Sequence, residues 1–368
     1  MASSILLLSL LAVWLSPGVQ SFAVPTTSTT MITTTTSHGP KVLRKIVQES
    51  SQKQSLDQRG ILWLEHLNLI VGDMETATKF YIDFLGMTAE REHNVKSNHF
   101  NLGQQQFHLA AASNNENDAP QRVTGSIGLT VPNLTKIRDR IDIAKKELDG
   151  TLFSINDDDD SNNIMTVTCP WGNVIHLYDI SIDDEYCLSE QLESTQQKMV
   201  KLHSKGGDYG THRMAVRGKP GIRYVELKCR KGTADSIAKF YESIMGCHVT
   251  RTGKDVVTVC VGPGVHLVFA EHEQLSDHEV AQMRGVHACI YISNFEKTYN
   301  TLKNMNMIWT NPRFTHLDSC DTWEEAFASR TFRFKDFISK GEKIFELEHE
   351  VRPMMHGQFM KVPPYVPN

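Results

Sequence analysis

The chain has 368 residues, of which 40% are hydrophobic and 22% charged, and its formal net charge is −5. This length allows two domains of ordinary size, and the slightly acidic balance does not favour a nucleic acid or an anionic surface as partner. The seven cysteines are odd in number and scattered, without a Cys-x-x-Cys pair. They fit reduced thiols better than a disulfide framework, and their spacing excludes a zinc ribbon.

The first 55 residues are typical of a targeting sequence. Ile5 to Leu15 form an apolar run of signal-peptide length that is too short to span a bilayer. Small residues precede Phe22, and the segment 26–48 that follows is rich in hydroxyls and free of Asp and Glu. This order resembles the bipartite plastid presequence of diatoms and related algae. We expect residues 1–55 to be a disordered presequence of a plastid protein without a membrane span in its mature form, with secretion as the alternative.

From residue 60 the pattern changes to strand, helix and further strands. Residues 61–71 alternate like a half-buried strand, and Asp73 is a suitable N-cap for a helix that ends at Gly86. Strands follow through residue 113. The same order then returns at 125–180, with a helix expected over 134–150 and a hairpin turning at 171–173.

A polar linker is expected at 181–220, and the order of elements begins again at residue 221. Val225 to Cys247 aligns without a gap to Glu65 to Met87, which places Phe240-Tyr241 on Phe80-Tyr81 as core pairs. We therefore predict four βαβββ units in an α+β fold. Two would form an N-terminal domain (60–180) and two a C-terminal domain (221–350), followed by a tail (351–368).

These repeats resemble the vicinal oxygen chelate superfamily, which includes glyoxalase I, fosfomycin-resistance proteins, methylmalonyl-CoA epimerase and extradiol dioxygenases. The resemblance rests on "FYIDFLGM", "FYESIMGC", "CPWGNVIHLYD" and "GEKIFELEHE". It implies paired units that form two open eight-stranded cups, with a divalent metal held by the first strand and a late strand of each unit. The metal would chelate two adjacent oxygens of a small-molecule substrate. A homodimer is a further expectation.

The resemblance also implies metal ligands at particular positions. In the C-terminal domain these are Glu226, His266, His287 and Glu346. In the N-terminal domain they are His66, His108, Ser126 and His176, of which Ser126 departs from the pattern. Except for His66, which follows Glu65, the His and Glu candidates stand between apolar neighbours, as side chains on the open face of a strand do. A lone His or Glu on a strand is usually an ordinary polar residue, but two imidazoles and two carboxylates together suit Zn, Ni, Fe or Mn.

Two arrangements of these ligands stay open. A site within the C-terminal domain would use its four candidates, and residue chemistry favours this version because it yields one balanced site. A site shared between the domains would use His66, His108, His287 and Glu346. The linker is long enough for either version.

The function favoured by the resemblance is that of a metal-dependent, glyoxalase-I-like lyase or isomerase, with Glu346 or Glu226 acting as the base. One alternative is an Fe(II) extradiol-type dioxygenase with the facial triad His266, His287 and Glu346. Glu226 argues against it, because extradiol enzymes carry a His at that position. The other alternative is a protein that binds or sequesters a small molecule without catalysis.

Overall fold

The structure, a computed structural model, describes residues 38–53, 60–89, 95–102, 105–113, 119–157, 163–179 and 221–359. The signal-like run, the hydroxyl-rich segment before residue 38 and the linker expected at 181–220 lie outside these ranges. Among the described residues, no helix is long and apolar enough to cross a membrane.

The first two repeats have the expected order of elements. The first contains β1 (Ile61–Val71), α2 (Met74–Thr78), the π-helical η1 (Lys79–Phe84), β2 (Thr88–Ala89), β3 (Ser97–Leu102) and β4 (Gln105–Ala111). The second contains β5 (Ser126–Val131), α3 (Leu134–Arg138), α4 (Ile141–Glu147), β6 (Ser154–Asn156), β7 (Ile164–Thr168) and β8 (Val174–Asp179). The single helix expected over 134–150 is thus two short helices.

The third repeat contains β9 (Ile222–Arg230), α6 (Ala234–Ser243), β10 (Val249–Thr252), β11 (Val256–Gly262) and β12 (Val265–His272). After α7 (Asp277–Gln282), the fourth contains β13 (His287–Ile292), α8 (Phe295–Asn304), α9 (Thr315–Asp318), α10 (Trp323–Ser329), β14 (Phe332–Ser339) and β15 (Glu342–Pro353). In all four repeats the last strand lies parallel to the first. The predicted repetition and α+β class are confirmed.

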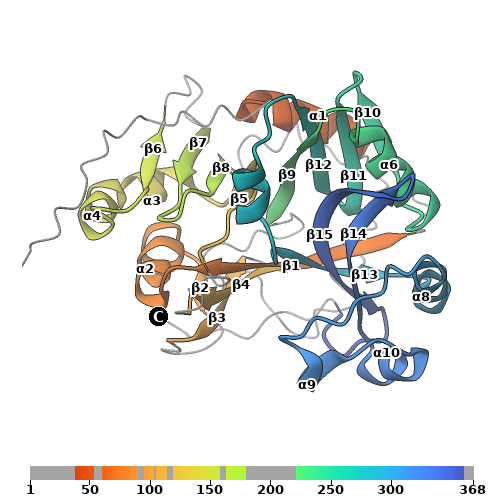
Figure 1. Cartoon of the computed structure of the whole chain (residues 1–368). Coiled ribbons are helices and arrows are strands. Elements are labelled where there is room, and N and C mark those ends of the chain that lie inside the picture. The colour runs from red at the N-terminus through yellow and green to blue at the C-terminus, as the bar shows by residue number, and fades with distance from the viewer. Residues whose placement is uncertain are drawn as a thin grey trace, which may run out of the picture. The chain divides into compact units, whose positions relative to one another are not determined.

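The strands form two sheets (Figure 1). One has seven strands in the order β14-β15-β13-β1-β4-β3-β2, and the other has eight in the order β10-β11-β12-β9-β5-β8-β7-β6. The first therefore has one strand fewer than expected, because the isolated bridge between Ile308 and Phe334 takes the place of a strand in the fourth repeat.

Each sheet joins repeats from different halves of the chain. β1 pairs antiparallel with β13, and β5 pairs antiparallel with β9. The first repeat thus shares a sheet with the fourth, and the second with the third. The expectation of one cup in residues 60–180 and another in 221–350 is wrong. Each repeat leaves its first strand at an edge, and an antiparallel ladder can form there with any other repeat, so order along the chain does not decide the partner.

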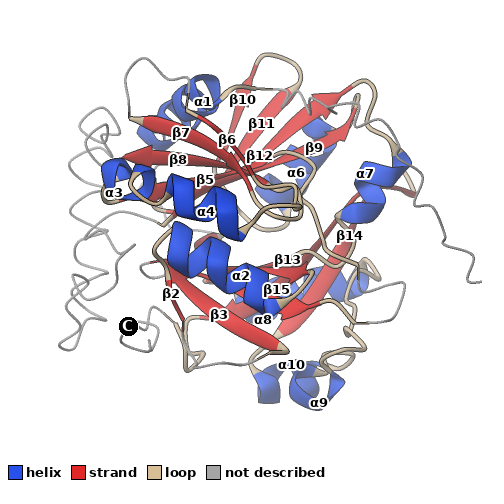
Figure 2. Cartoon of the chain, turned by 90° about the vertical axis from the view of Figure 1, so that its left-hand side faces the viewer, coloured by secondary structure: helices blue, strands red, loops and turns tan. Residues whose placement is uncertain are grey.

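Helices lie between the two sheets, where Figure 2 shows α2 and α4. Their apolar stripes form one core with the inner faces of both sheets. Phe80 and Tyr81 are buried in it, as are Phe240 and Tyr241, so both pairs have the predicted core role. The outer face of each sheet does not belong to this core. We call the outer face of the seven-stranded sheet cup A and that of the eight-stranded sheet cup B.

Cup B is filled by helix α1 (Pro40–Lys53), a segment that the sequence analysis assigned to a disordered presequence. Leu43, Ile46 and Val47 are buried against residues of the sheet, namely Ile164, Tyr178, Tyr224, Val256, Val268 and Ala270. That assignment is wrong for residues 40–53. The apolar residues of 40–53 recur at helical spacing. The sequence analysis overlooked this spacing because the segment directly follows hydroxyl-rich residues and was judged by its composition.

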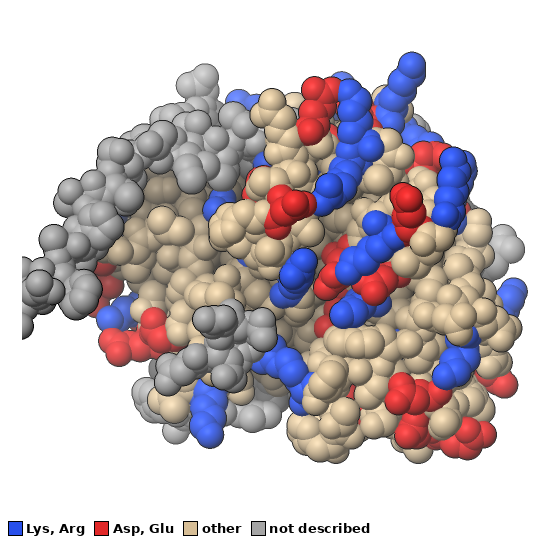
Figure 3. All heavy atoms as spheres, viewed as in Figure 1, with Lys and Arg blue, Asp and Glu red and all other residues tan. Residues whose placement is uncertain are grey.

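The exposed surface carries mixed charges. Figure 3 shows basic and acidic side chains interspersed over the face that it presents. Many form exposed ion pairs, such as Arg251 with Glu242 and Lys239 with Asp235. Exposed pairs of this kind add little to stability.

Candidate metal centre

The pairing of β1 with β13 brings two predicted histidines together in cup A. In this antiparallel ladder His66 lies opposite Cys289, and Asn68 lies opposite His287. The rings of His66 and His287 have their centroids 5.8 Å apart. Both side chains are almost completely buried.

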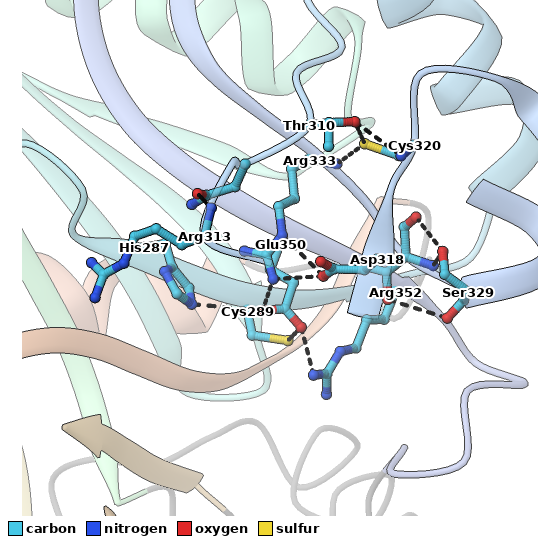
Figure 4. Close-up of polar contacts among 12 residues, drawn as sticks. His287, Cys289, Thr310, Arg313, Asp318, Cys320, Ser329, Arg333, Glu350 and Arg352 are labelled. Carbon is cyan, nitrogen blue, oxygen red and sulfur yellow. Dashed lines mark hydrogen bonds and ion pairs between the residues drawn. The ribbon is translucent and has the colours of Figure 1, made fainter. Parts of the chain in front are cut away.

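A carboxylate from β15 completes the group. β15 runs parallel to β13 and places Glu350 beside Cys289. The Oε2 atom of Glu350 lies 3.8 Å from Nε2 of His66 and 3.6 Å from Nε2 of His287. Figure 4 shows His287 and Glu350 directed toward each other. One ligand atom from each of the three residues lies within 4.8 Å of the others.

The two imidazoles are in the state that a metal ligand requires. Nδ1 of His66 lies 3.1 Å from a carboxylate oxygen of Glu65, which leaves Nε2 without a hydrogen bond to any described residue although it is buried. Burial lowers the pKa of His66, and Glu65 and Glu350 offset this only in part. Burial and Arg333 hold the pKa of His287 well below its usual value. Neutral imidazoles oriented by a carboxylate on the far nitrogen are typical of metal sites.

A family model matches part of the chain that supplies this site. It spans residues 63–177 and carries the description Glyoxalase/Bleomycin resistance protein/Dioxygenase superfamily. Residues 63–177 are a domain of this superfamily. No curated protein matches the chain.

The comparison with solved structures finds matches of low sequence identity to this chain. A glyoxalase I mutant from Zea mays has 14% identity and a TM-score of 0.47, covering 79% of this chain and 93% of its own. A putative dioxygenase from Bacillus subtilis has 13% identity and a TM-score of 0.45, covering 82% and 87%. A 4-hydroxymandelate synthase mutant from Streptomyces coelicolor has 13% identity and a TM-score of 0.28, covering 83% and 97%.

Two arginines hold the carboxylate of the site. Arg333 donates to one oxygen of Glu350 at 2.7 Å, and Arg352 lies 2.5 Å from the other. Burial raises the pKa of Glu350, but Arg352, Arg333 and the two histidines outweigh it and hold the pKa well below its usual value. Glu350 is therefore ionised at neutral pH. Metal-binding carboxylates commonly accept such hydrogen bonds as well, so the arginines are compatible with a ligand role.

His108, another of the ligands expected from the resemblance, lies next to His66. Its ring stacks on His66 with centroids 3.5 Å apart, and His99 stacks on its other side at 3.6 Å. One ring nitrogen of His108 lies 2.8 Å from Oε1 of Gln106. His108 and His99 are half-buried, whereas His66 is 1% exposed. This stack thus leads from the solvent toward the candidate ligands.

A second group of possible ligands overlaps the first. It consists of Glu65, His66 and Cys289. Burial holds the pKa of the Cys289 thiol well above its usual value, and only the thiolate is a good ligand. Glu65 also accepts hydrogen bonds from Tyr291 and Arg352. The group of His66, His287 and Glu350 therefore suits a metal better.

Glu346 is not part of the candidate centre. It stands on the same strand as Glu350 but four residues earlier, paired with Lys343 and lining a separate cleft of about 480 Å³. The stretch "ELEHE" offers Glu346, Glu348 and Glu350 on one face of the strand. Only the pairing of β15 with β13 decides which of the three lies beside the histidines, and the sequence does not show it.

Glu226 and His266 lie in cup B, on the other sheet. Glu226 is fully buried, accepts a hydrogen bond from Ser126 at 2.8 Å and lies 3.6 Å from Nδ1 of His38. Nε2 of His266 lies 3.5 Å from the Ser51 hydroxyl of α1. The expected C-terminal set of four ligands, and the facial triad with His266, are therefore not brought together.

Register explains why the third repeat departs from the others. In the other three repeats, the candidate on the last strand lies opposite the residue that comes two positions after the candidate on the first strand. His108 lies opposite Asn68, which follows His66 by two. In the same way His176 lies opposite Gly128, and Glu350 lies opposite Cys289. In the third repeat the residue two positions after Glu226 is Lys228, and it lies opposite Ala270. His266 lies opposite Tyr224 instead, so it does not occupy the matching position on the last strand.

His176 stands at the matching position of cup B, but it is bonded elsewhere. Its Nδ1 atom lies 2.7 Å from the Tyr224 hydroxyl. Among the described residues, cup B supplies no group of three close ligands. Cup A is therefore the candidate metal centre.

Proposed function

We propose that the chain is an Fe(II)-dependent dioxygenase that acts on a small molecule with two adjacent oxygens. The supporting observation is that two imidazole Nε2 atoms and one carboxylate oxygen meet on the concave face of one sheet. Two histidines and one carboxylate on one side of a metal are the ligand set of non-haem Fe(II) oxygenases. Iron held there would supply open coordination positions for substrate and dioxygen.

The surrounding side chains have clear parts in this proposal. Glu65 accepts a hydrogen bond from the Nδ1–H of His66 and so keeps Nε2 directed at the metal position. Arg333 and Arg352 keep Glu350 ionised and fixed. The objection that Glu226 occupies a position where a dioxygenase needs a His loses its force, because Glu226 lies in cup B.

A glyoxalase-type lyase or isomerase is the second candidate. His108 favours it, since a fourth superfamily position with a ligand-capable side chain would suit a four-ligand Lewis-acid metal. Such a reaction needs a base that removes a C–H proton. Glu346 and Glu226 stand outside the site, and two arginines hold Glu350. This shortage of a free carboxylate base places the lyase second.

Metal analysis of single variants tests the proposed centre. Protein loaded with Fe(II) without oxygen, and in parallel with Ni(II), Zn(II) or Mn(II), is analysed for bound metal. H66A, H287A and E350Q should each lose most of the metal. H266A and E346Q, which change the ligands expected from sequence, are matched controls and should keep it. Equal metal in both groups would refute this centre.

Oxygen consumption then separates the two candidate reactions. The Fe(II)-loaded protein should consume dioxygen with a member of a panel of catechols and related vicinal oxygen compounds. A lyase would instead convert the adduct of glutathione and methylglyoxal without oxygen, with Zn(II) or Ni(II) bound. Turnover of that adduct alone would replace the dioxygenase by the second candidate.

A further inference from the structure

The fourth repeat differs from the others in the connection between its helix and the following strand. The corresponding connections in the other repeats run from Phe84 to Thr88, from Glu147 to Ser154 and from Ser243 to Val249. In the fourth repeat the connection runs from Asn304 to Phe332 and contains α9 and α10. We call residues 305–331 the insertion. It belongs to the repeat that supplies His287 and Glu350.

The insertion packs against the candidate metal centre. The ring of Phe314 meets the ring of His287 edge-on, with centroids 5.9 Å apart. Arg333, which holds Glu350, lies over the ring of Phe314 at 4.6 Å from its centroid. The amide of Asn311 donates to both oxygens of Glu348, at 2.9 and 3.0 Å. The segment 311–314 is therefore fixed beside the site.

Arg313 is the cation that this segment places at the edge of the site. Its backbone N–H donates to Oδ1 of Asn311 at 2.9 Å, which fixes the start of the side chain. In Figure 4 the side chain extends past His287, away from Glu350. Arg313 is exposed, and its guanidinium has no ion pair or hydrogen bond to the described residues. Arg333 is buried and Arg352 half-buried, and in contrast to Arg313 each binds carboxylates.

We propose that Arg313 binds a carboxylate group of the substrate. This inference rests on the proposed function, because the same substrate would bind the metal through its adjacent oxygens. A guanidinium presents paired N–H donors that match the two oxygens of a carboxylate. A phosphate carries nearly two charges at neutral pH, so one carboxylate is the better match for one arginine. The substrate class is then a small hydroxylated or oxo carboxylic acid.

The test compares chelators that differ in one carboxylate. Ni(II)-loaded protein, which holds the metal without consuming oxygen, is titrated calorimetrically with catechol, 2,3-dihydroxybenzoate and 3,4-dihydroxybenzoate. The quantity of interest is the ratio of each acid's affinity to that of catechol. R313Q should lower this ratio about tenfold for at least one acid, since a hydrogen bond to a charged group is lost. Its catechol affinity and metal content should not change.

Two further variants control for charge and size. R313K should keep part of the preference, because the charge stays and the paired donors are lost. K297Q removes one positive charge from the exposed side of α8 and should leave every ratio as in the wild type. Unchanged ratios for both acids in R313Q would overturn the role of Arg313 while leaving the metal centre intact. Wild-type protein that binds no metal would overturn the proposed function itself, and this proposal with it.

Discussion

The rings of His66 and His287 lie 5.8 Å apart at an angle of 68°, although the two residues stand on the first strands of the first and the last repeat. Their proximity comes from the ladder between β1 and β13, which closes only when both halves of the chain are folded. Metal binding by His66 and His287 is therefore linked to folding of the whole chain. Both halves of the site come from one chain, so no second copy is needed to complete it.

Metal loading should stabilise the protein through this linkage. A ligand that binds only the folded state at a hundredfold excess over its dissociation constant adds about 2.7 kcal/mol. Thermal unfolding with and without Fe(II) or Ni(II) measures the effect. E350Q should abolish the shift in melting temperature, whereas E346Q should retain it. The same shift in both variants would contradict the assignment of Glu350.

Removal of the carboxylate behind His66 should weaken metal binding without removing a ligand. Such partners typically contribute ten- to a hundredfold in affinity. E65Q should therefore raise the metal dissociation constant by about that factor, measured by competition with a chelator. E342Q changes an exposed residue of β15 and should have no effect. Partial recovery in E65D would separate orientation of His66 from a general loss of folding.

The sequence predicted the order of strands and helices common to the repeats, because hydrophobic periodicity and glycine positions are local, but it missed α1. Gly86 and Gly246 both end their helices with positive φ, as the aligned repeats indicated. The choice between Glu346 and Glu350 was not local. Both stand on the open face of the same strand, but Glu350 lies opposite Cys289 of β13, whereas Glu346 precedes the β13 ladder and pairs with Asp336 of β14.

The sequence also did not show which repeats share a sheet. Residue chemistry favoured a site within the C-terminal domain, since Glu226, His266, His287 and Glu346 form a balanced set. The sheets instead join the first and the fourth repeats. A pairing between edge strands is a long-range property, and the composition of the strands does not encode it in any visible way.

Two buried histidines of cup B predict a dependence of stability on pH. Burial lowers the pKa of His176 to about 4 and that of His266 to about 3. In the unfolded chain both return to a pKa of about 6.5. The unfolded state therefore binds protons first, so this stability is complete above pH 6.5 and is lost as the pH falls below it. At pH 5 the loss is about 2 kcal/mol for each histidine.

Urea unfolding at pH 7 and pH 5 measures this effect. H176Q should reduce the difference in unfolding free energy between the two pH values, because one of the two protonation events is removed. The exposed His278 supplies the control, since its side chain meets water in the folded and the unfolded chain alike. A pH effect in H176Q as large as in the wild type would contradict the role of His176.

The packing of α1 predicts unequal effects for two adjacent substitutions. Leu43 is fully buried against cup B, whereas its neighbour Val42 is 48% exposed. L43A should cost about 2–5 kcal/mol of unfolding free energy, as cavity-forming changes in cores do. V42A should cost much less, because its side chain already meets solvent. Equal and small losses in chemical denaturation would show that α1 does not contribute to the fold.

Helix α1 also limits where a presequence can be removed. We propose that the chain is directed to a plastid by a signal peptide followed by a hydroxyl-rich segment, with secretion as the alternative destination. Processing should remove at least residues 1–21, but it must spare α1, since Leu43, Ile46 and Val47 fill cup B. The N-terminus of the native protein should therefore lie after residue 21 and before Pro40, which N-terminal sequencing determines. A native chain that starts near Met1 would refute the targeting proposal, and one that starts beyond Lys53 would show that cup B is open in the mature protein.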